Sequence, residues 1–264
     1  WKQVNDNSDH LQRAGYYTQN LADPQDENKL YSLNARFYKS VDGGETFKQY
    51  GVPHGDVHAL WINPNDPDHM VVGNDGGAQV SIDGAETWST YHNQPTAEMY
   101  SVTVDNEFPY NVYGPQQDNS TIRLPSWTSG SIHPKSNWTS VGGCETGPIS
   151  LHPDRPWIVF SGCYGGLLTR WNERTGQSLN VMVYPQLQIG MAPRDLRERF
   201  QWNAPILVSQ HNPDVIYNAS QHIWRSPDLG ITWNRISDDL TTDTEAHQDY
   251  AGEPITKDNT GVEV

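Results

Sequence analysis

The chain has 264 residues, which is enough to bury a large core, and length alone allows one all-β domain or two smaller ones. Its formal net charge of −15 argues against nucleic acid or an anionic membrane surface as partners, because both would repel it. No apolar run approaches the roughly 18 residues that a membrane-spanning helix needs. We therefore expect no nucleic-acid partner and no direct membrane span.

Short strand-forming segments dominate the rest of the sequence. Gly, Pro, Asn and Asp recur between runs of β-branched and aromatic residues, a combination that favours an all-β protein. Five of these runs each follow a proline-containing turn, and we expect strands at Lys29–Leu33, Met70–Gly73, Tyr110–Tyr113, Trp157–Ser161 and Val215–Asn218.

These turns repeat at a nearly constant spacing. They start near residues 21, 63, 105, 152 and 211, with intervals of 42, 42, 47 and 59 residues. A period of about 40–50 residues with several strands per unit is typical of β-propeller blades. We therefore predict one propeller segment, residues 1–264, with about five four-stranded antiparallel blades.

The second repeat shows the unit most clearly. Val57–Ile62 has the composition of a buried strand, and Asn74–Gly77 is a glycine-rich turn that lets Ala78–Ile82 return antiparallel. The last interval is longer because it holds an insertion, residues 185–199, with the one helix that the sequence suggests at Pro193–Phe200. Insertions of this kind often carry function.

Three repeats share an octapeptide with the pattern Ser-x-Asp-x-Gly-x-Thr-aromatic. The copies are Ser40–Phe47, Ser81–Trp88 and Ser226–Trp233, and Ala85 replaces the glycine in the second. Such a turn needs an acceptor for backbone N–H groups and a glycine with positive φ. We assign Asp42, Asp83 and Asp228 a structural role.

The octapeptides resemble the Asp boxes of BNR-repeat propellers, a group that includes sialidases, xyloglucanases and sortilins. In that group the Asp box lies on the rim, away from the functional centre. A closer resemblance, to the large bacterial sortilin-like exported proteins often labelled glycosyl hydrolases, covers nearly the whole chain. It rests on Ala22–Pro24, Pro53–Asp56, Gly73–Gly77, Asn93–Ala97, Tyr113–Thr121, Val141–Glu145, Gly162–Gly166 and Pro254–Gly261.

That resemblance implies a central piece of a longer, exported polypeptide. The N-terminal Trp1–Asn5 has no secretory signal, so a signal would lie outside this chain. An open arc of five blades exposes two sheet edges, which is unfavourable. We expect the remaining blades or a partner chain to close the ring, in a periplasmic or secreted location.

The sharpest metal-binding pattern is His54-x-Asp56-x-His58. On a strand these three residues share one face, so two imidazoles and a carboxylate would converge on a divalent cation. The alternative is that His58 is hydrogen-bonded beneath Leu60 and Trp61 while Asp56 caps a turn. No cofactor is required, and a divalent cation is the one that the pattern suggests.

A second group of candidates comes from the polar turn after each blade's second strand. Equivalent turns in successive blades point to one end of the central channel, where propellers bind ligands. Asp75, Asp118 and Glu145 are the candidate acid and base for glycoside hydrolysis, and the alternative is that these turns satisfy their own buried amides. The candidate ligand-binding residues are Asn74, Asp75, Gln117, Asp118, Asn119, Tyr164, Trp202, Gln221 and His222.

Aromatic residues and cysteines complete the candidates. Stacking on sugars is one role for Trp127, Trp138, Trp157, Trp171, Trp202 and Tyr164, although we expect core packing for most and single out Trp202. Cys144 and Cys163 flank neighbouring strands, within reach of a disulfide. Two buried thiols or a soft metal site are the alternatives.

We therefore expect a non-enzymatic module that binds a peptide, a glycan or a partner subunit. The alternatives are a glycoside hydrolase of xyloglucanase type and an extrinsic subunit of a larger extracytoplasmic complex.

Overall fold

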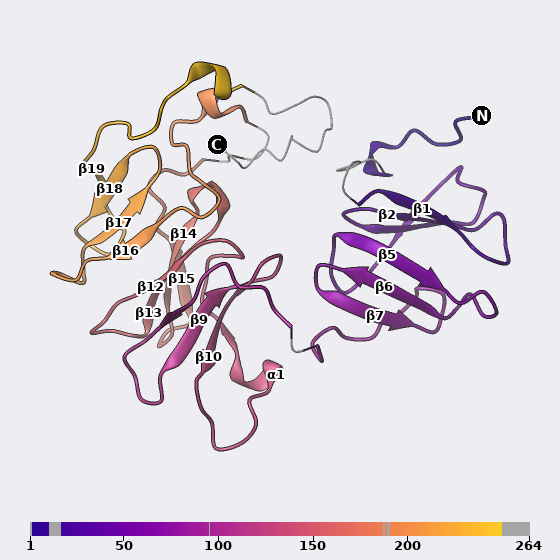
Figure 1. Ribbon diagram of the computed structural model, residues 1–264, viewed down its shortest axis with the longest axis horizontal. Helices are drawn as coiled ribbons and strands as arrows, with labels where there is room; N and C mark the ends of the chain where they lie inside the picture. Colours follow the sequence, from indigo (N-terminus) through magenta and orange to yellow (C-terminus); the bar gives the residue numbers. More distant parts are fainter. Residues whose placement is uncertain (1, 11–16, 95, 187, 189–190, 250–264) are drawn as a thin grey trace. The chain divides into compact units, whose positions relative to one another are not determined.

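The computed structural model describes residues 2–10, 17–94, 96–186, 188 and 191–249 (Figure 1). These residues form two compact units, one up to residue 94 and one from residue 96 onward. Each unit is built from antiparallel sheets whose strands follow one another in chain order. Within the described ranges, no helix has the length and apolar character needed to cross a membrane.

The first unit contains two sheets. The first sheet has the order β1-β2-β3-β4, and the second has β5-β6-β7. In place of a fourth strand, Ser89 donates one backbone hydrogen bond to Val80, with an N–O distance of 2.9 Å. The strands are β1 (Gln19–Ala22), β2 (Leu30–Leu33), β3 (Phe37–Ser40), β4 (Lys48–Tyr50), β5 (Val57–Ile62), β6 (Met70–Asn74) and β7 (Gly77–Ser81).

The second unit contains three four-stranded sheets, β8 to β11, β12 to β15 and β16 to β19. Their strands are β8 (Thr103–Val104), β9 (Asn111–Pro115), β10 (Thr121–Pro125), β11 (Thr139–Ser140), β12 (Ile149–Leu151), β13 (Ile158–Gly162), β14 (Leu168–Asn172), β15 (Gln177–Asn180), β16 (Ile206–Val208), β17 (Ile216–Ala219), β18 (Ile223–Ser226) and β19 (Asn234–Arg235).

The cores lie between neighbouring sheets of each unit. In the first unit, Tyr31, Leu33 and Phe37 of one sheet pack with Val57 and Val72 of the other. In the second unit, one cluster joins β13 and β14 to β16 and β17, and another joins β9 to β12 and β13. Face-to-face packing of successive meanders is the arrangement expected of propeller-type blades.

The predicted all-β fold and its repeat are confirmed. Each of the five strands expected after a proline-containing turn is present within one or two residues of its predicted bounds, and Val57–Ile62 matches β5. The sheet that contains β5 has three strands where four were expected.

The helix predicted at Pro193–Phe200 is wrong. The structure has only a 3₁₀ turn at Pro193–Asp195, and Leu196 returns to extended backbone. The following backbone groups bond to side chains from other segments, because the Arg199 N–H donates to Gln221 and the Arg197 carbonyl accepts from it. Helical structure in the described residues is otherwise limited to α1 (Pro134–Asn137) and three further 3₁₀ turns.

The three octapeptide turns share one hydrogen-bond network. In the first, the Ser40 hydroxyl donates to Asp42 at 2.7 Å and accepts from the Gly44 N–H at 2.9 Å. The Asp42 carboxylate accepts from both the N–H and the hydroxyl of Thr46. The same bonds recur around Ser81 and Ser226.

Candidate functional site

Three aromatic rings from different sheets meet in the second unit. Tyr164 and Trp202 are stacked, with ring centroids 5.1 Å apart and planes 27° apart. The Trp202 indole N–H donates to the Tyr100 hydroxyl at 3.1 Å. Tyr100 leads into β8, Tyr164 follows β13, and Trp202 leads into β16, so each sheet of the unit contributes one ring. We call these three residues the aromatic cluster.

A disulfide fixes the turn that carries Tyr164. Cys163 immediately precedes Tyr164 and is bonded to Cys144, with the two Cα atoms 4.9 Å apart. Gly165 then takes φ +68°, a left-handed conformation that lets the chain turn back into β14. Of the alternatives that the sequence left open for the cysteines, the structure has the disulfide.

Side chains of the insertion and of a neighbouring turn hold Trp202 in place. The Gln188 amide donates to the Phe200 carbonyl at 3.0 Å, and the fully buried Phe200 ring packs on Gly166. The Gln221 side chain bonds the backbone at Arg197 and Arg199, at 3.0 and 2.8 Å. Because the anchored residues Arg197, Arg199 and Phe200 precede Trp202 closely, these contacts fix the direction in which its ring enters the cluster.

Three carboxylates lie near enough to Tyr100 to affect its pKa. Burial raises the pKa of Tyr100, and the nearby charges of Glu145, Asp118 and Glu98 raise it further, against the opposing hydrogen bond from Trp202. Tyr100 therefore stays neutral at physiological pH. These negative charges disfavour an anionic ligand at the aromatic cluster.

Glu145 has a structural task at this place. One of its carboxylate oxygens accepts the backbone N–H of Asp118 at 2.6 Å, and Asp118 has φ +58° at the tip of the β9–β10 turn. The Gln117 N–H donates to the Glu98 carbonyl, and the Asn119 amide donates to the Gln117 carbonyl. The backbone of the predicted polar turn is thus hydrogen-bonded, with two of these partners, Glu98 and Glu145, from outside the turn.

The other predicted turn of this unit is mainly an anchor. Gln221 is buried and serves the insertion, as described above, while the adjacent His222 N–H donates to the Ser220 hydroxyl. The Ser220 hydroxyl in turn donates to the buried Glu198 carboxylate at 2.7 Å, which also accepts from the Trp224 indole at 3.1 Å.

Each residue of the predicted cation site makes a contact with a different group. His54 contacts the Gly55 carbonyl, Asp56 accepts from the Tyr17 hydroxyl at 2.8 Å, and His58 lies 2.6 Å from Asp75. The argument from a shared strand face does not apply, because β5 begins only at Val57. In the described part of the chain, no group of three or more His, Cys, Asp or Glu side chains is placed to hold a metal ion.

The candidate residues Asn74 and Asp75 belong to the first unit. Asn74 donates to Gln79 at 2.7 Å and accepts the Gly76 N–H, which closes its own hairpin turn. Asp75 pairs with His58 across β5 and β6. Both side chains therefore have a defined role in the turn after β6.

The remaining aromatic candidates divide between core and surface. Trp157 and Trp171 pack against the two cores of the second unit, and the Arg174 guanidinium covers Trp157. Trp138 is partly buried. Trp127 is 65% exposed and does not pack in a core.

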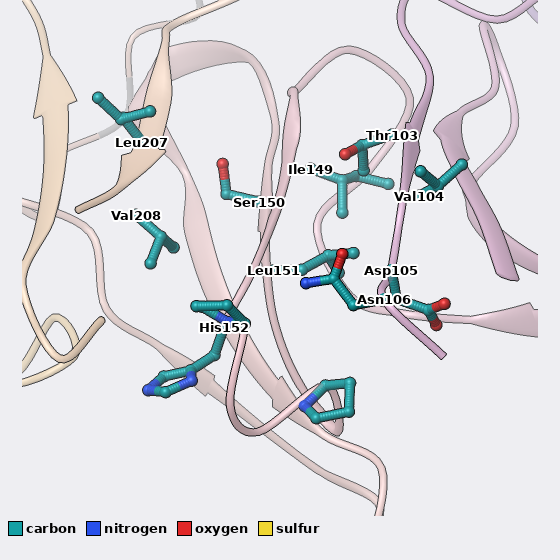
Figure 2. Close-up of a pocket in the computed structure, with 12 residues that line it drawn as sticks. Thr103, Val104, Asp105, Asn106, Ile149, Ser150, Leu151, His152, Leu207 and Val208 are labelled. Atoms are coloured by element: carbon teal, nitrogen blue, oxygen red, sulfur yellow. The ribbon is translucent and has the colours of Figure 1, made fainter. Parts of the chain in front are cut away.

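The first strands of the three sheets in the second unit line a groove that the sequence did not predict. It has a volume of about 200 Å³ and lies between β8, β12 and β16 (Figure 2). At one end the His152 ring is almost fully buried, and its Nδ1 atom accepts the N–H groups of Asp154 and Arg155. Burial, aided by the Arg155 charge, lowers the pKa of His152, so it is a neutral structural histidine.

Tyr100 is the residue of the cluster that sequence reasoning missed. It precedes a two-residue strand, and no motif marks it. A signal was available in its alignment with Trp202, since both are aromatic residues shortly before the first strand of a sheet.

Comparison with known proteins gives limited matches. No protein-family model matches the chain. One curated protein, an oligoxyloglucan-reducing end-specific xyloglucanase of Emericella nidulans, is 31% identical over 100 residues, covering 31% of this chain and 12% of that enzyme. The chain thus spans only a small part of that relative.

Among solved structures, an ancestral GH74 enzyme has a TM-score of 0.35 at 12% identity, covering 84% of this chain and 31% of its own. The GH74 xyloglucanase from Xanthomonas campestris has a TM-score of 0.36 at 18% identity, covering 83% and 38%. A structure of YCF48 bound to D1 peptide has a TM-score of 0.34 at 13% identity, covering 81% and 66%. At these values the likenesses carry no argument about function.

Proposed function

We propose that this chain is a non-catalytic binding module that takes a neutral glycan on the aromatic cluster. The observation that carries the proposal is the convergence of Tyr100, Tyr164 and Trp202 from three sheets onto one place. Flat, partly exposed rings with polar edges suit ligands that have both apolar faces and hydroxyl groups. The Cys144–Cys163 bond and the buried Gln221 hold the rings in place before a ligand arrives, which lowers the entropy cost of binding.

The charges around the cluster select the class of glycan. Glu98, Asp118 and Glu145 lie near Tyr100, and the whole chain carries −15. Sugars that carry carboxylate or sulfate groups would be repelled, whereas neutral sugars accept hydrogen bonds and donate them to carboxylates. Gln117, Asp118 and Asn119 supply the polar groups of this site in the proposal.

The test is a glycan array probed with the wild-type protein and with Trp202→Ala and Tyr164→Ala. We expect binding to neutral oligosaccharides only, and a loss of about 2 kcal/mol, roughly 30-fold, in each variant, as for aromatic hot spots in general. Trp61→Ala is the matched control, because Trp61 is an exposed tryptophan of the first unit. Peptide binding in place of glycan binding, or unchanged affinity in Trp202→Ala, would contradict the proposal.

A glycoside hydrolase is the second candidate, favoured by the 31% identity with a xyloglucanase over 100 residues. Glycoside hydrolysis requires two carboxyl groups at a set separation. Against this candidate, Glu145 is hydrogen-bonded to the Asp118 N–H. Release of new reducing ends from xyloglucan oligosaccharides, abolished by Asp118→Asn or Glu145→Gln, would establish the hydrolase instead.

We further propose that the module works outside the cytoplasm and that additional blades or a partner chain complete its ring. The disulfide supports the first part, because such bonds persist in oxidising compartments. If the ring were completed by a partner chain in a larger complex, co-purification from the native source would recover that chain.

A further inference from the structure

A second group of aromatic side chains is exposed at the other end of the sheet β8 to β11. Phe108 is 98% exposed, Trp127 is 65% exposed and Tyr110 is 47% exposed. No other large hydrophobic residue in the described ranges is as exposed as Phe108. We call Phe108, Tyr110 and Trp127 the aromatic tip.

The sheet brings these three residues together. Phe108 and Tyr110 lie just before β9, and Trp127 lies just after β10. Asn111 pairs with Pro125 at this end of the two strands, and the Ser126 N–H donates to the Tyr110 carbonyl at 2.8 Å. Trp127 is therefore next to the segment that carries the other two rings.

A buried aspartate makes the tip rigid. Asp105 accepts the N–H groups of Glu107 and Asn111, the Asn111 side-chain amide and the Tyr113 hydroxyl, at distances between 2.7 and 3.2 Å. Against the opposing effect of burial, the bonds from Asn111 and Tyr113 lower the pKa of Asp105, so it is ionised. Phe108 is thus held out in solvent by an ordered turn.

The other four sheets carry no aromatic residue at the place of Phe108. Counted from the backbone hydrogen bond that these turns share, that place is taken by Asp26, Asp66, Arg155 and Asn212, and Trp157, the counterpart of Tyr110, is partly buried beneath Arg174. The connection after the third strand is an octapeptide turn in three of them and a short turn at Asn172–Gly176 in the fourth, whereas here it extends from residue 126 to residue 138. Both departures from the repeat occur at the same end of the same sheet.

We propose that the aromatic tip is a second glycan-binding site, for the chain of a neutral polysaccharide. The three side chains expose on the order of 400 Å² of aromatic surface, given about 200 Å² for each whole ring. A stable protein interface needs about 800 Å² per partner, so the tip is too small for one by itself. It is large enough for two or three sugar rings.

The charges at the tip agree with a neutral ligand. Within residues 105–110 and 126–132 the charged residues are the buried Asp105 and the exposed Glu107. The other neighbours are uncharged hydrogen-bonding groups, including Asn106, Ser126 and Thr128. The one lysine of the connection from residue 126 to residue 138 is Lys135, so a polyanionic glycan or an anionic lipid surface would meet one cation against two carboxylates.

This site is separate from the aromatic cluster and does not rest on the proposed function. β9 and β10 each have five residues, so their two ends are about 15 Å apart. A short oligosaccharide would occupy one site only. A long polysaccharide that reached both would bind more tightly than to either alone, through the raised effective concentration at the second site.

The experiment is affinity electrophoresis in gels that contain soluble xyloglucan, alongside calorimetric titration with a short neutral oligosaccharide. The variants are Phe108→Ala/Trp127→Ala for the tip, Trp202→Ala for the cluster and Trp61→Ala as the matched control. We expect the tip variant to lose at least fivefold in apparent affinity for the polymer, while Trp61→Ala binds the polymer as tightly as the wild type. All substituted tip residues are exposed, and near-ultraviolet circular dichroism verifies that the variant is folded.

The outcomes separate the two proposals. Reduced polymer affinity in the tip variant with none in Trp202→Ala supports the tip and overturns the cluster. Unchanged polymer affinity in the tip variant overturns the tip, whatever Trp202→Ala does. A tip variant that shifts from dimer to monomer in sedimentation, with polymer affinity unchanged, would make the tip a contact between copies of the chain and also overturn the proposal.

Discussion

At the scale of single residues, the aspartates of the octapeptide turns show how one side chain fixes a local fold. Asp42 accepts three hydrogen bonds, from Thr46 twice and from Ser40. The hydrogen bonds from Thr46, with that from Ser40, lower the pKa of Asp42 from 3.8 to about 2. The pKa of Asp83 and of Asp228 is lowered by the equivalent bonds.

The lowered pKa of Asp42 in the folded state predicts how acid affects stability. Because the folded-state pKa of Asp42 lies below the unfolded value, its contribution is complete above about pH 4 and is lost as the pH falls toward about 2. Asp42→Asn should therefore have a lower melting temperature than the wild type at pH 6, and the gap should close by pH 2. Equal melting temperatures at pH 6 would show that the carboxylate contributes nothing.

A second prediction at this scale concerns Ala85. It has φ +76°, where the other two turns have glycines, Gly44 at +89° and Gly230 at +90°. A left-handed conformation costs an L-residue about 1–2 kcal/mol, and glycine avoids this cost. Part of the gain is offset because glycine loses more conformational entropy on folding. Ala85→Gly should raise the free energy of unfolding by about 0.5 kcal/mol.

The control for Ala85 is the reverse substitution. Gly230→Ala would place a methyl group 2.7 Å from Val181 Cβ, at positive φ. We expect it to lower stability by more than 1 kcal/mol. Denaturant unfolding of both variants measures the two effects, and a destabilised Ala85→Gly would show that the buried methyl group outweighs the backbone strain.

At the scale of elements, the turn that carries Tyr164 depends on its disulfide. The bond spans a sequence separation of 19 residues. In the chain-entropy model such a loop stabilises the folded state by about 3 kcal/mol. Replacing both cysteines by serine should lower the unfolding free energy by about that amount. It should also weaken glycan binding, because the disulfide no longer holds the turn that carries Tyr164 in place. Unchanged glycan affinity in the double variant would show that the binding site does not depend on the disulfide.

Packing of the insertion gives a further prediction. A Cβ atom on Gly166 would lie 2.3 Å from the Phe200 ring at φ +74°, whereas one on Gly176 meets nothing within 4 Å at φ +67°. Both alanine variants bear the same backbone cost, and only Gly166→Ala adds a clash. We expect Gly166→Ala to lose several kcal/mol more than Gly176→Ala in chemical denaturation and to bind glycan weakly.

The strands were predictable and the site was only partly so, for physical reasons. Strand positions follow from local turn chemistry, which repeats. The helix at Pro193–Phe200 failed because side chains distant in sequence, above all Gln221, bond the backbone that a helix would have used. Trp202 was predicted as a residue that stacks on sugars. Its hydrogen-bond partner Tyr100 is 102 positions away, and no local sequence pattern links the two residues.

At the scale of the whole molecule, the repeat organises the chain into two compact units with separate cores. Only the second unit contains the disulfide among the described residues. We therefore expect calorimetry to give two thermal transitions and a reducing agent to lower one of them by several degrees. A single transition that moves as a whole would show that the units unfold cooperatively.

The repeat also explains why the two proposed sites lie at opposite ends of one sheet. Turns after second strands carry Tyr164 and Asp118, while the turns before second strands carry Phe108. Departures from the repeat, namely the insertion and the aromatic tip, coincide with these places. In this account the regular sheets are the scaffold, and the irregular turns carry the recognition.

The most direct test of the central claim is calorimetric titration of a neutral oligosaccharide into the wild type, Tyr164→Ala, Trp202→Ala and the double variant. Because the two rings are stacked, removing either should cost about 2 kcal/mol, and removing both should cost much less than the sum. Wild-type affinity in both single variants would contradict a glycan site at the aromatic cluster.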